Sequence, residues 1–400
     1  MARSKFLLIF ILGLLAALGP FSIDMYLPGF KAIAKDLHTD VANVSLSLSS
    51  FFIGISAGQL LYGPLLDKFG RKKPLYFGLA LYIAASLGCL FVTSIDQLIV
   101  LRFVQAIGSC ATAVAAVAMV RDLFTVEESP KVFASLMLVI AASPMLAPTA
   151  GGYFIAAMGW PSVFVFLSFM ALLMLVLSIW KLPESYKPDP SYSLKPKPIL
   201  SNFLVVIKEP SFYTYALVSA ITFSGLFAYV SSSPIVFMDI YQVSETGYGW
   251  IFALLSAFFI GFSQVNSYIL RWFTSKQIVN WALLAQAIVS ILFLVAALHN
   301  LLNLYTTVSF IALFLACLGF INPNASALAL APFSKNAGSA SALMGALQMG
   351  LGALASALIS VFAADAVWPM PAVMTMAALI ALCCLFLGSS QIRPNTANNA

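Results

Sequence analysis

The chain has 400 residues, of which 62% are apolar and only 8% are charged. Soluble proteins carry about 25% charged residues, so a soluble fold has too few polar side chains here to cover its surface. The formal net charge is +6, but the basic residues are spread in small groups between apolar runs rather than collected on one face. The composition therefore excludes a soluble domain, argues against a nucleic-acid partner and predicts a membrane protein.

Apolar stretches recur along the chain, each long enough to cross a hydrocarbon layer of about 30 Å as a helix. The first contains Asp24 and has no small-residue cleavage site, so we expect a retained helix rather than a signal peptide. The five cysteines lie inside apolar runs without metal-ligand spacing, and we expect no metal site. The predicted spans are 6–28, 42–66, 74–95, 97–120, 131–157, 160–180, 211–237, 246–270, 278–298, 302–328, 338–363 and 368–389.

The longest polar stretch, 181–210, has six prolines and five lysines and separates six spans from six. We therefore predict an all-α membrane protein with twelve transmembrane helices in two pseudo-symmetric six-helix bundles, at 1–180 and 211–400, joined by a cytoplasmic linker. Proline makes the linker semi-rigid, although 199–207 has the pattern of a short interfacial helix.

The basic residues predict the orientation of the chain. With both termini in the cytoplasm, seventeen of the twenty basic residues fall in cytoplasmic segments. The exceptions are Lys31 and Lys35 in outer loops and Arg102 within a span. Because positively charged residues stay on the cytoplasmic side, we expect a multi-pass inner-membrane protein with cytoplasmic termini and a short cytoplasmic tail.

Two formal charges lie within spans and away from their ends, Asp24 in the first span and Arg102 in the fourth. A charge at depth costs at least a few kcal/mol unless it faces protein, water or a partner, so both side chains should point into the bundle. Both fall in the outer half of the membrane, where they could pair. Asp24 can alternate between protonated and charged forms and is the candidate proton carrier, whereas Arg102 is a fixed positive charge. A purely structural role is the alternative for each residue.

Several spans also carry polar or aromatic side chains on one helical face. Small residues in such stripes more often indicate close helix packing, so the amides are the better candidates to line a cavity. Aromatic residues make up 13% of the chain, and a large apolar site with few polar groups suits lipophilic or cationic compounds better than sugars. The candidate substrate-binding residues are Tyr26, Gln59, Gln105, Phe223, Tyr229 and Gln348.

A charged turn between the second and third spans reads Gly63-Pro-Leu-Leu-Asp67-Lys-Phe-Gly70-Arg71-Lys72. Gly70 permits a sharp reversal, and Arg71 and Lys72 can pair with acids such as Glu127 or Glu128, or hold anionic lipid headgroups. This turn resembles the signature loop of the major facilitator superfamily, in which the acidic residue and the arginine hold together the cytoplasmic ends of the halves. The second half preserves such a loop poorly.

Two further motifs carry the same resemblance. Arg102-Phe-Val-Gln105 is similar to the family's fourth-helix motif, with Ala106 where glycine is usual. The fifth span has Pro144, Pro148, Gly151 and Gly152 in the spacing of the antiporter motif, with Ser143 and Ala147 replacing two of its glycines. Proline bends this helix, and the paired glycines allow a neighbouring helix to come close. The resemblance implies an antiporter, and therefore export.

The whole chain resembles the bicyclomycin and chloramphenicol resistance (Bcr/CflA) branch of the drug:H⁺ antiporters, through Ser22-Ile-Asp24-Met-Tyr26-Leu-Pro28 and the pair Arg121-Asp122 after the fourth span. Related antiporters use an acidic residue at the position of Asp24 for proton and substrate coupling. The resemblance implies a monomeric, non-enzymatic exporter of small drugs or metabolites, powered by the proton gradient without a cofactor, whose other partners are protons and membrane lipids. A metabolite symporter or a transport-dead sensor is the alternative.

Overall fold

The computed structural model describes residues 2–125, 128–188, 196–333, 337–362 and 366–391, and every regular element among them is helical. The first half contains α1 Ala2–Asp24, η1 Leu27–Gly29, α2 Phe30–Asp36, α3 Val41–Phe69, α4 Lys72–Gly88, η2 Cys89–Phe91, α5 Ile95–Leu123, α6 Ser129–Met158 and α7 Pro161–Lys181. The second half contains α8 Pro196–Ile207, α9 Pro210–Pro234, η3 Ile235–Ile240, α10 Glu245–Ile269, α11 Ser275–Leu298, α12 Leu304–Leu330, α13 Ala337–Phe362 and α14 Pro369–Ser389.

Twelve of these segments are long and apolar enough to cross a membrane, and they confirm the twelve predicted spans with boundaries that differ by a few residues. The first is longer than predicted, because η1 and α2 continue it to Asp36. Likewise, the seventh extends through a π-helical turn that follows Pro234. The short helix predicted in the linker is present as α8 and begins at Pro196, three residues earlier than expected.

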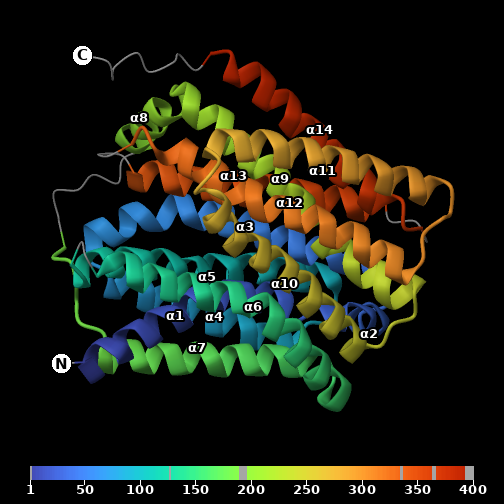
Figure 1. Ribbon diagram of the computed structural model, residues 1–400. Coiled ribbons are helices and arrows are strands. Elements are labelled where there is room, and N and C mark those ends of the chain that lie inside the picture. Colours follow the sequence, from blue (N-terminus) through green and yellow to red (C-terminus); the bar gives the residue numbers. More distant parts are fainter. Residues whose placement is uncertain (1, 126–127, 189–195, 334–336, 363–365, 392–400) are drawn as a thin grey trace, which may run out of the picture.

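The long helices run roughly side by side, and α1 begins and α14 ends toward the left in Figure 1. We call the end of the bundle where α1 begins and α14 ends the terminal end, and we call the opposite end the far end. Two helix pairs join the first half to the second, α3 with α13 and α6 with α10. The two halves therefore meet through two long seams, and side chains on these four helices decide what lies between them.

Local signals explain where several helices begin and end. Asp40 caps α3 by accepting a hydrogen bond from the Asn43 backbone, and Thr274 and Gln277 form a capping box at the start of α11. Gly70, at φ +83°, ends α3 in a conformation that residues with a Cβ atom rarely adopt. The predicted tight turn between the second and third spans is therefore confirmed.

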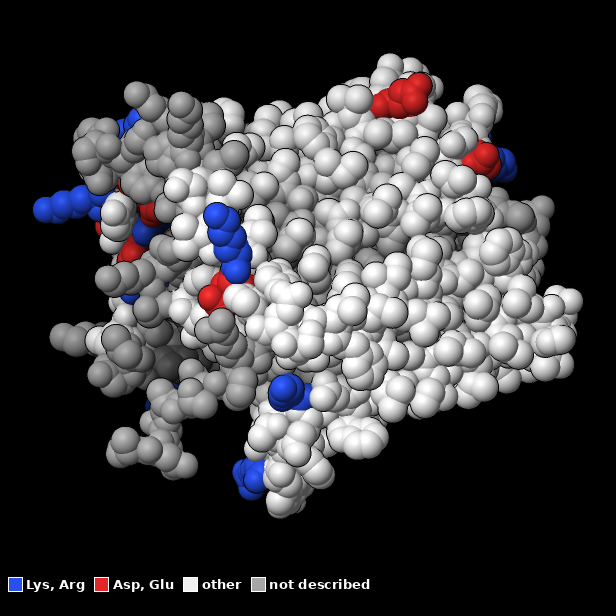
Figure 2. Space-filling model, turned by 90° about the horizontal axis from the view of Figure 1, so that it is seen from above, with Lys and Arg blue, Asp and Glu red and all other residues white. Residues whose placement is uncertain are grey.

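Charged side chains gather at the two ends of the molecule and leave a broad uncharged band between them (Figure 2). Basic residues dominate the terminal end, whereas at the far end Lys31 on α2 forms an ion pair with Asp239 on η3, with Nζ and Oδ1 3.1 Å apart. The uncharged band is the surface that faces hydrocarbon, since exposed charges are costly there.

Candidate transport site

Arg102 is completely buried on α5 and is held by α1. Its Nη2 donates to the backbone carbonyl of Ser22 at 2.8 Å, and its Nη1 donates to Gln105 one turn along α5. The guanidinium carbon lies 4.2 Å from the ring centre of Tyr26 and 4.1 Å from that of Phe51. Hydrogen bonds and aromatic faces together replace the water that a buried cation loses, so Arg102 fastens α1 to α5.

Asp24 lies at the last residue of α1 and is only 5% exposed. Among the described residues its carboxyl group has neither a hydrogen-bond donor nor an ion-pair partner, and its oxygens retain some exposure. The pair between Asp24 and Arg102 that the sequence left open is not formed in this structure, because Arg102 binds the backbone of Ser22 instead. The carboxyl group lies close enough to Tyr229 and Tyr248 of the second half to affect both phenols electrostatically.

Three of the predicted substrate-binding side chains are buried in packing contacts. The hydroxyl groups of Tyr26 and Ser47 are 2.9 Å apart, and Gln105 donates to Ser86 at 2.6 Å. The ring of Tyr229 stacks on Phe252 with centroids 5.5 Å apart, and its hydroxyl has no partner among the described residues. These contacts place the three residues in the packed interior in this conformation, and their predicted substrate role remains a prediction.

The other three, Gln59 on α3, Phe223 on α9 and Gln348 on α13, are partly exposed. Gln348 belongs to a polar cluster that sequence reasoning missed: its Nε2 donates to Ser219 Oγ at 2.9 Å and to Asn322 Oδ1 at 3.2 Å. Ser219 Oγ in turn donates to Asn322 Oδ1 at 2.7 Å. Asn322 and Asn324 inside one apolar span were the available signal, but one sequence does not show that α9, α12 and α13 bring Ser219, Asn322 and Gln348 together.

The glycine pair of the predicted antiporter motif lies where α6 meets its neighbours. A Cβ atom on Gly151 would collide with the backbone carbonyl of Met25, and one on Gly152 would lie 2.6 Å from that of Glu245 on α10. On the same stretch, Thr149 Oγ1 donates to the carbonyl of Gly249 at 3.1 Å. Helix α6 continues through both prolines, and its small residues bring the two halves into backbone contact toward the far end.

Close packing also surrounds the fourth-helix motif. Ala106, which replaces the usual glycine, faces Gly54 on α3, where a Cβ would lie 2.6 Å from that of Ala106. Gly108 packs on α4, since its Cβ would lie 2.6 Å from the carbonyl of Gly78. Gly54 on α3 therefore leaves room for the methyl group of Ala106.

The signature loop forms a charge network at the terminal end. Arg71 Nη1 donates to Asp67 and its Nε to Asp122, each at 2.8 Å, and Tyr186 lies under the guanidinium at 4.3 Å. Burial alone would lower the pKa of Arg71, but the hydrogen bonds to Asp122 and Asp67 outweigh it and raise the pKa. Glu184, just beyond α7, accepts hydrogen bonds from the backbone amides of Arg71 and Lys72 and so caps α4.

This network corrects the expected partners of the loop. Arg71 pairs with Asp122, and Lys72 donates to the carbonyl of Leu182, while Glu128 pairs with Lys5. Glu127 lies outside the described residues. All of these contacts are within the first half and the segment after α7, so among the described residues the loop does not join the two halves.

Two motif positions make no comparable contact. A Cβ on Gly63 would meet nothing within 4 Å, and Arg121 is exposed without an ion pair to a described residue. Their predicted conformational role therefore gains no support from packing in this conformation.

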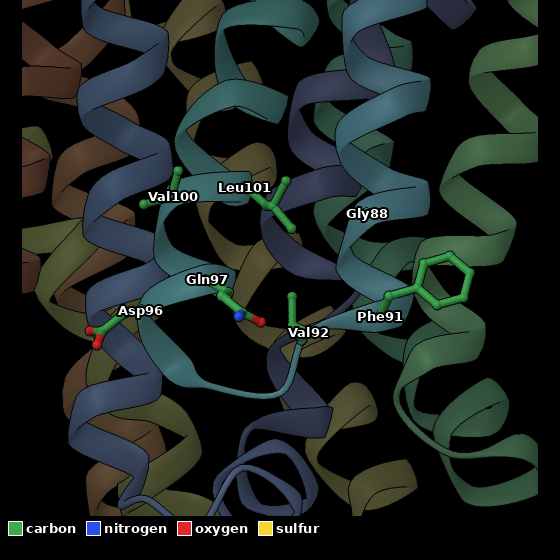
Figure 3. Close-up of a pocket in the computed structure, with 7 residues that line it drawn as sticks. All are labelled: Gly88, Phe91, Val92, Asp96, Gln97, Val100 and Leu101. Atoms are coloured by element: carbon green, nitrogen blue, oxygen red, sulfur yellow. The ribbon is translucent and has the colours of Figure 1, made fainter.

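A groove of about 460 Å³ lies at the far end between η2 and the start of α5, lined by Phe91, Val92, Val100 and other mostly apolar residues (Figure 3). Phe91 is 80% exposed and Val100 is 60% exposed. The groove involves only the first half and opens on the outer surface of the bundle, so it is separate from the region between the halves.

Comparison with known proteins agrees with the fold and motifs. A family model described as the Major Facilitator Superfamily matches residues 10–357. The chain is 32% identical to the bicyclomycin resistance protein homolog of Haemophilus influenzae, over 98% of both chains. It is 29% identical to multidrug resistance protein MdtL of Shigella flexneri, over 84% of this chain and 83% of that one.

Solved structures show the same fold. A bacterial homolog of the human lysosomal transporter Spinster superposes with a TM-score of 0.75 at 14% identity, over 99% of both chains. A D-xylose-proton symporter superposes with a TM-score of 0.73 at 15% identity, over 94% of this chain and 97% of that one. The chain belongs to the major facilitator superfamily, whose members move small molecules across membranes, and the predicted resemblance to its drug-resistance branch is confirmed.

Proposed function

We propose that the protein exports small lipophilic or cationic drugs from the cytoplasm to the periplasm of a bacterium in exchange for protons, by alternating access. Substrate binds from the cytoplasm or the inner leaflet while Asp24 is deprotonated, and protonation from outside favours release. Proton and substrate then stabilise different conformations, which couples their movements. The proton gradient is the energy source, and because one chain carries both halves, a monomer suffices.

The observation that carries this proposal is the position of Asp24. Its carboxyl group is nearly enclosed, has no cation or donor among the described residues and lies near Tyr229 and Tyr248 of the second half. A carboxyl group without a fixed partner is free to gain and lose a proton as the halves move apart. A structural carboxylate would instead be paired, as Asp122 is with Arg71.

The distribution of charge supports the direction of transport. The excess of basic side chains at the terminal end supports a cytoplasmic position for that end in a bacterial inner membrane. The halves are held together at the far end by the Lys31–Asp239 ion pair, by the backbone contact of Gly152 with Glu245 and by the hydrogen bond from Thr149 to Gly249. Breaking these contacts would open the far end, toward the periplasm, which is the step that release requires.

Reconstituted vesicles with an imposed pH gradient test the proposal. Proton flux is measured on adding chloramphenicol, bicyclomycin or a lipophilic cation, with wild-type protein, Asp24→Asn and the matched control Asp96→Asn, which changes an exposed acid at the far end. We expect substrate to dissipate the gradient with wild type and the control but not with Asp24→Asn. Full proton-coupled flux in Asp24→Asn would move the proton site elsewhere.

A proton-coupled transporter of a native metabolite is the second candidate, since the same site serves a symporter or an exporter. The sign of the proton movement separates import from export, because a symporter brings protons in with its substrate. A transport-dead sensor would give no flux with any compound while still binding one.

A further inference from the structure

The cluster of Ser219, Asn322 and Gln348 is incompletely satisfied. Asn322 Oδ1 accepts from both Ser219 and Gln348, and Ser219 Oγ accepts from Gln348. Asn322 Nδ2 and Gln348 Oε1 have no partner among the described residues, and both atoms are accessible. One amide NH₂ group and one amide carbonyl of this cluster are therefore left free, while the Ser219 hydroxyl hydrogen-bonds to both amide side chains.

The cluster lies at the depth of a central transport site. At about 1.5 Å per residue from the terminal ends of α9, α12 and α13, the three residues are about 12–17 Å deep. These helices have 25–27 residues and are about 38–40 Å long, so the free groups lie within the hydrocarbon layer, somewhat on the terminal side of its middle. Polar groups left unpaired at that depth are costly unless water or a ligand reaches them.

The first half approaches the cluster through Gln59 on α3. Gln59 is about 15 Å from the terminal end of its helix and is accessible, with no hydrogen bond to a described residue. Its amide lies so close to Gly345 that a Cβ there would collide with it. Gly345 and Gln348 are one turn apart on α13, so Gln59 and the cluster face the same seam between the halves.

An apolar wall adjoins these amides. Phe223 follows Ser219 by one turn on α9, is partly exposed and packs edge-on against Phe227 with ring centroids 5.3 Å apart. Phe227 in turn lies 4.2 Å from Phe52 of the first half. The region thus combines hydrogen-bonding groups with an aromatic surface, as small-molecule sites usually do.

The cluster lies apart from Asp24 and has no described carboxylate beside it. Counted from the same end, Asp24 is about 10–20 Å farther along the bundle than the cluster. Of the described carboxyl groups in the membrane spans, Asp24 is the one away from the ends of its span, which continues to Asp36. A cation bound at the cluster would therefore find carbonyl and hydroxyl dipoles but no carboxylate beside it.

We propose that Gln348, Asn322 and Ser219 form a subsite that recognises a neutral secondary amide, with Asn322 Nδ2 donating to the ligand carbonyl and Gln348 Oε1 accepting from its N–H. Gln59 contributes a further amide from the opposite half. This proposal rests on the proposed export function and narrows its substrate class to neutral amide compounds, which the subsite prefers over permanent cations.

Transport in reconstituted vesicles tests this subsite with three probes: chloramphenicol, which contains a secondary amide, its N-methylated tertiary amide, which lacks the N–H, and tetraphenylphosphonium. In wild type, N-methylation should raise the half-saturating concentration about ten-fold, the effect of one lost hydrogen bond. Gln348→Met and Asn322→Leu should each raise the half-saturating concentration of chloramphenicol by a similar factor. Neither variant should change the half-saturating concentration of tetraphenylphosphonium. Gln264→Met, an exposed amide on α10, is the matched control.

The decisive result is non-additivity, because Gln348→Met and N-methylation remove the same hydrogen bond and should together cost no more than either alone. Equal weakening of all three probes in the variants would overturn the subsite and make its role structural. Flux of the cation with no response to either amide probe would overturn the subsite but leave the export function standing. No flux with any probe would overturn both. The comparison of the two amide probes uses only wild-type protein, so the inference remains testable if a variant fails to fold.

Discussion

Arg102 binds the backbone carbonyl of Ser22, two residues before Asp24, and not the carboxylate of Asp24. Arg102, which is completely buried among the described residues, therefore fastens α1 to α5 and does not balance the charge of Asp24. Asp24 is left without a counter-charge at the point where the two halves meet. We therefore expect Arg102 to contribute to stability and Asp24 to proton coupling.

Arg102→Lys should destabilise the protein by about 2 kcal/mol, because the compact ammonium group lacks the planar fork that reaches Gln105 and Ser22 while stacking flat on Tyr26 and Phe51. Thermal unfolding in detergent measures the loss, with the exposed Arg271→Lys as a control expected within about 0.5 kcal/mol of wild type. Unchanged stability together with lost proton coupling would instead place Arg102 in the proton pathway.

Gly152→Ala should weaken closure of the far end, since the added methyl group would lie 2.6 Å from the backbone carbonyl of Glu245 in the second half. Overpacking of this kind costs about 1–3 kcal/mol, which corresponds to roughly a ten-fold shift in a conformational equilibrium. Disulfide formation between Lys31→Cys and Asp239→Cys reports closure and should slow about ten-fold. Gly261→Ala, where a Cβ meets nothing within 4 Å, should leave the rate unchanged. An equal rate in Gly152→Ala would contradict the closure role.

A double-mutant cycle should find coupling of about 1–2 kcal/mol between Arg71→Gln and Asp122→Asn. Their side chains are 9% and 16% exposed and joined by a hydrogen bond, so solvent screens them little. The same cycle between Arg71→Gln and Glu128→Gln should give no coupling, because Glu128 pairs with Lys5. Chemical unfolding of the four proteins in each cycle supplies the free energies. Coupling to Glu128 in place of Asp122 would refute the network.

The Lys5–Glu128 pair should contribute little in spite of its short contact. The hydrogen bond from Lys5 lowers the pKa of Glu128. The contribution of the pair to folding stability is therefore present at pH values above the unfolded-state pKa of Glu128. It is lost as the pH falls through the lower folded-state pKa. Both side chains are at least 40% exposed, and salt screens such pairs. We expect Glu128→Gln to unfold at the wild-type temperature at neutral pH and physiological salt. A clear drop that persists in high salt would show that the pair is more than a surface contact.

Sequence patterns located the helices well because the signal for a span is local. About 20 apolar residues in a row are enough, and the positions of lysine and arginine between spans divide the two ends. The loop around Gly70 was also predictable, since its positive φ needs glycine. The irregular turn after Pro234 was missed because hydropathy does not distinguish a π-helical turn from an α-helical one.

The partners of the polar residues were harder to predict. The sequence pattern predicts similar membrane depths for Asp24 and Arg102, yet the arginine side chain binds the backbone of Ser22 on α1. Gln348 was a candidate from its helix face alone. Asn322 and Ser219 could be recognised as candidates only from their hydrogen bonds with Gln348 and with each other.

The sequence by itself determined twelve spans, two halves, the asymmetry of charge and the membership of a transporter family, because each follows from composition or from motifs along one segment. Tertiary structure alone decided which buried polar groups meet and which stay free. That outcome depends on how helices from distant parts of the chain rotate and pack against each other, and no single helix carries that information.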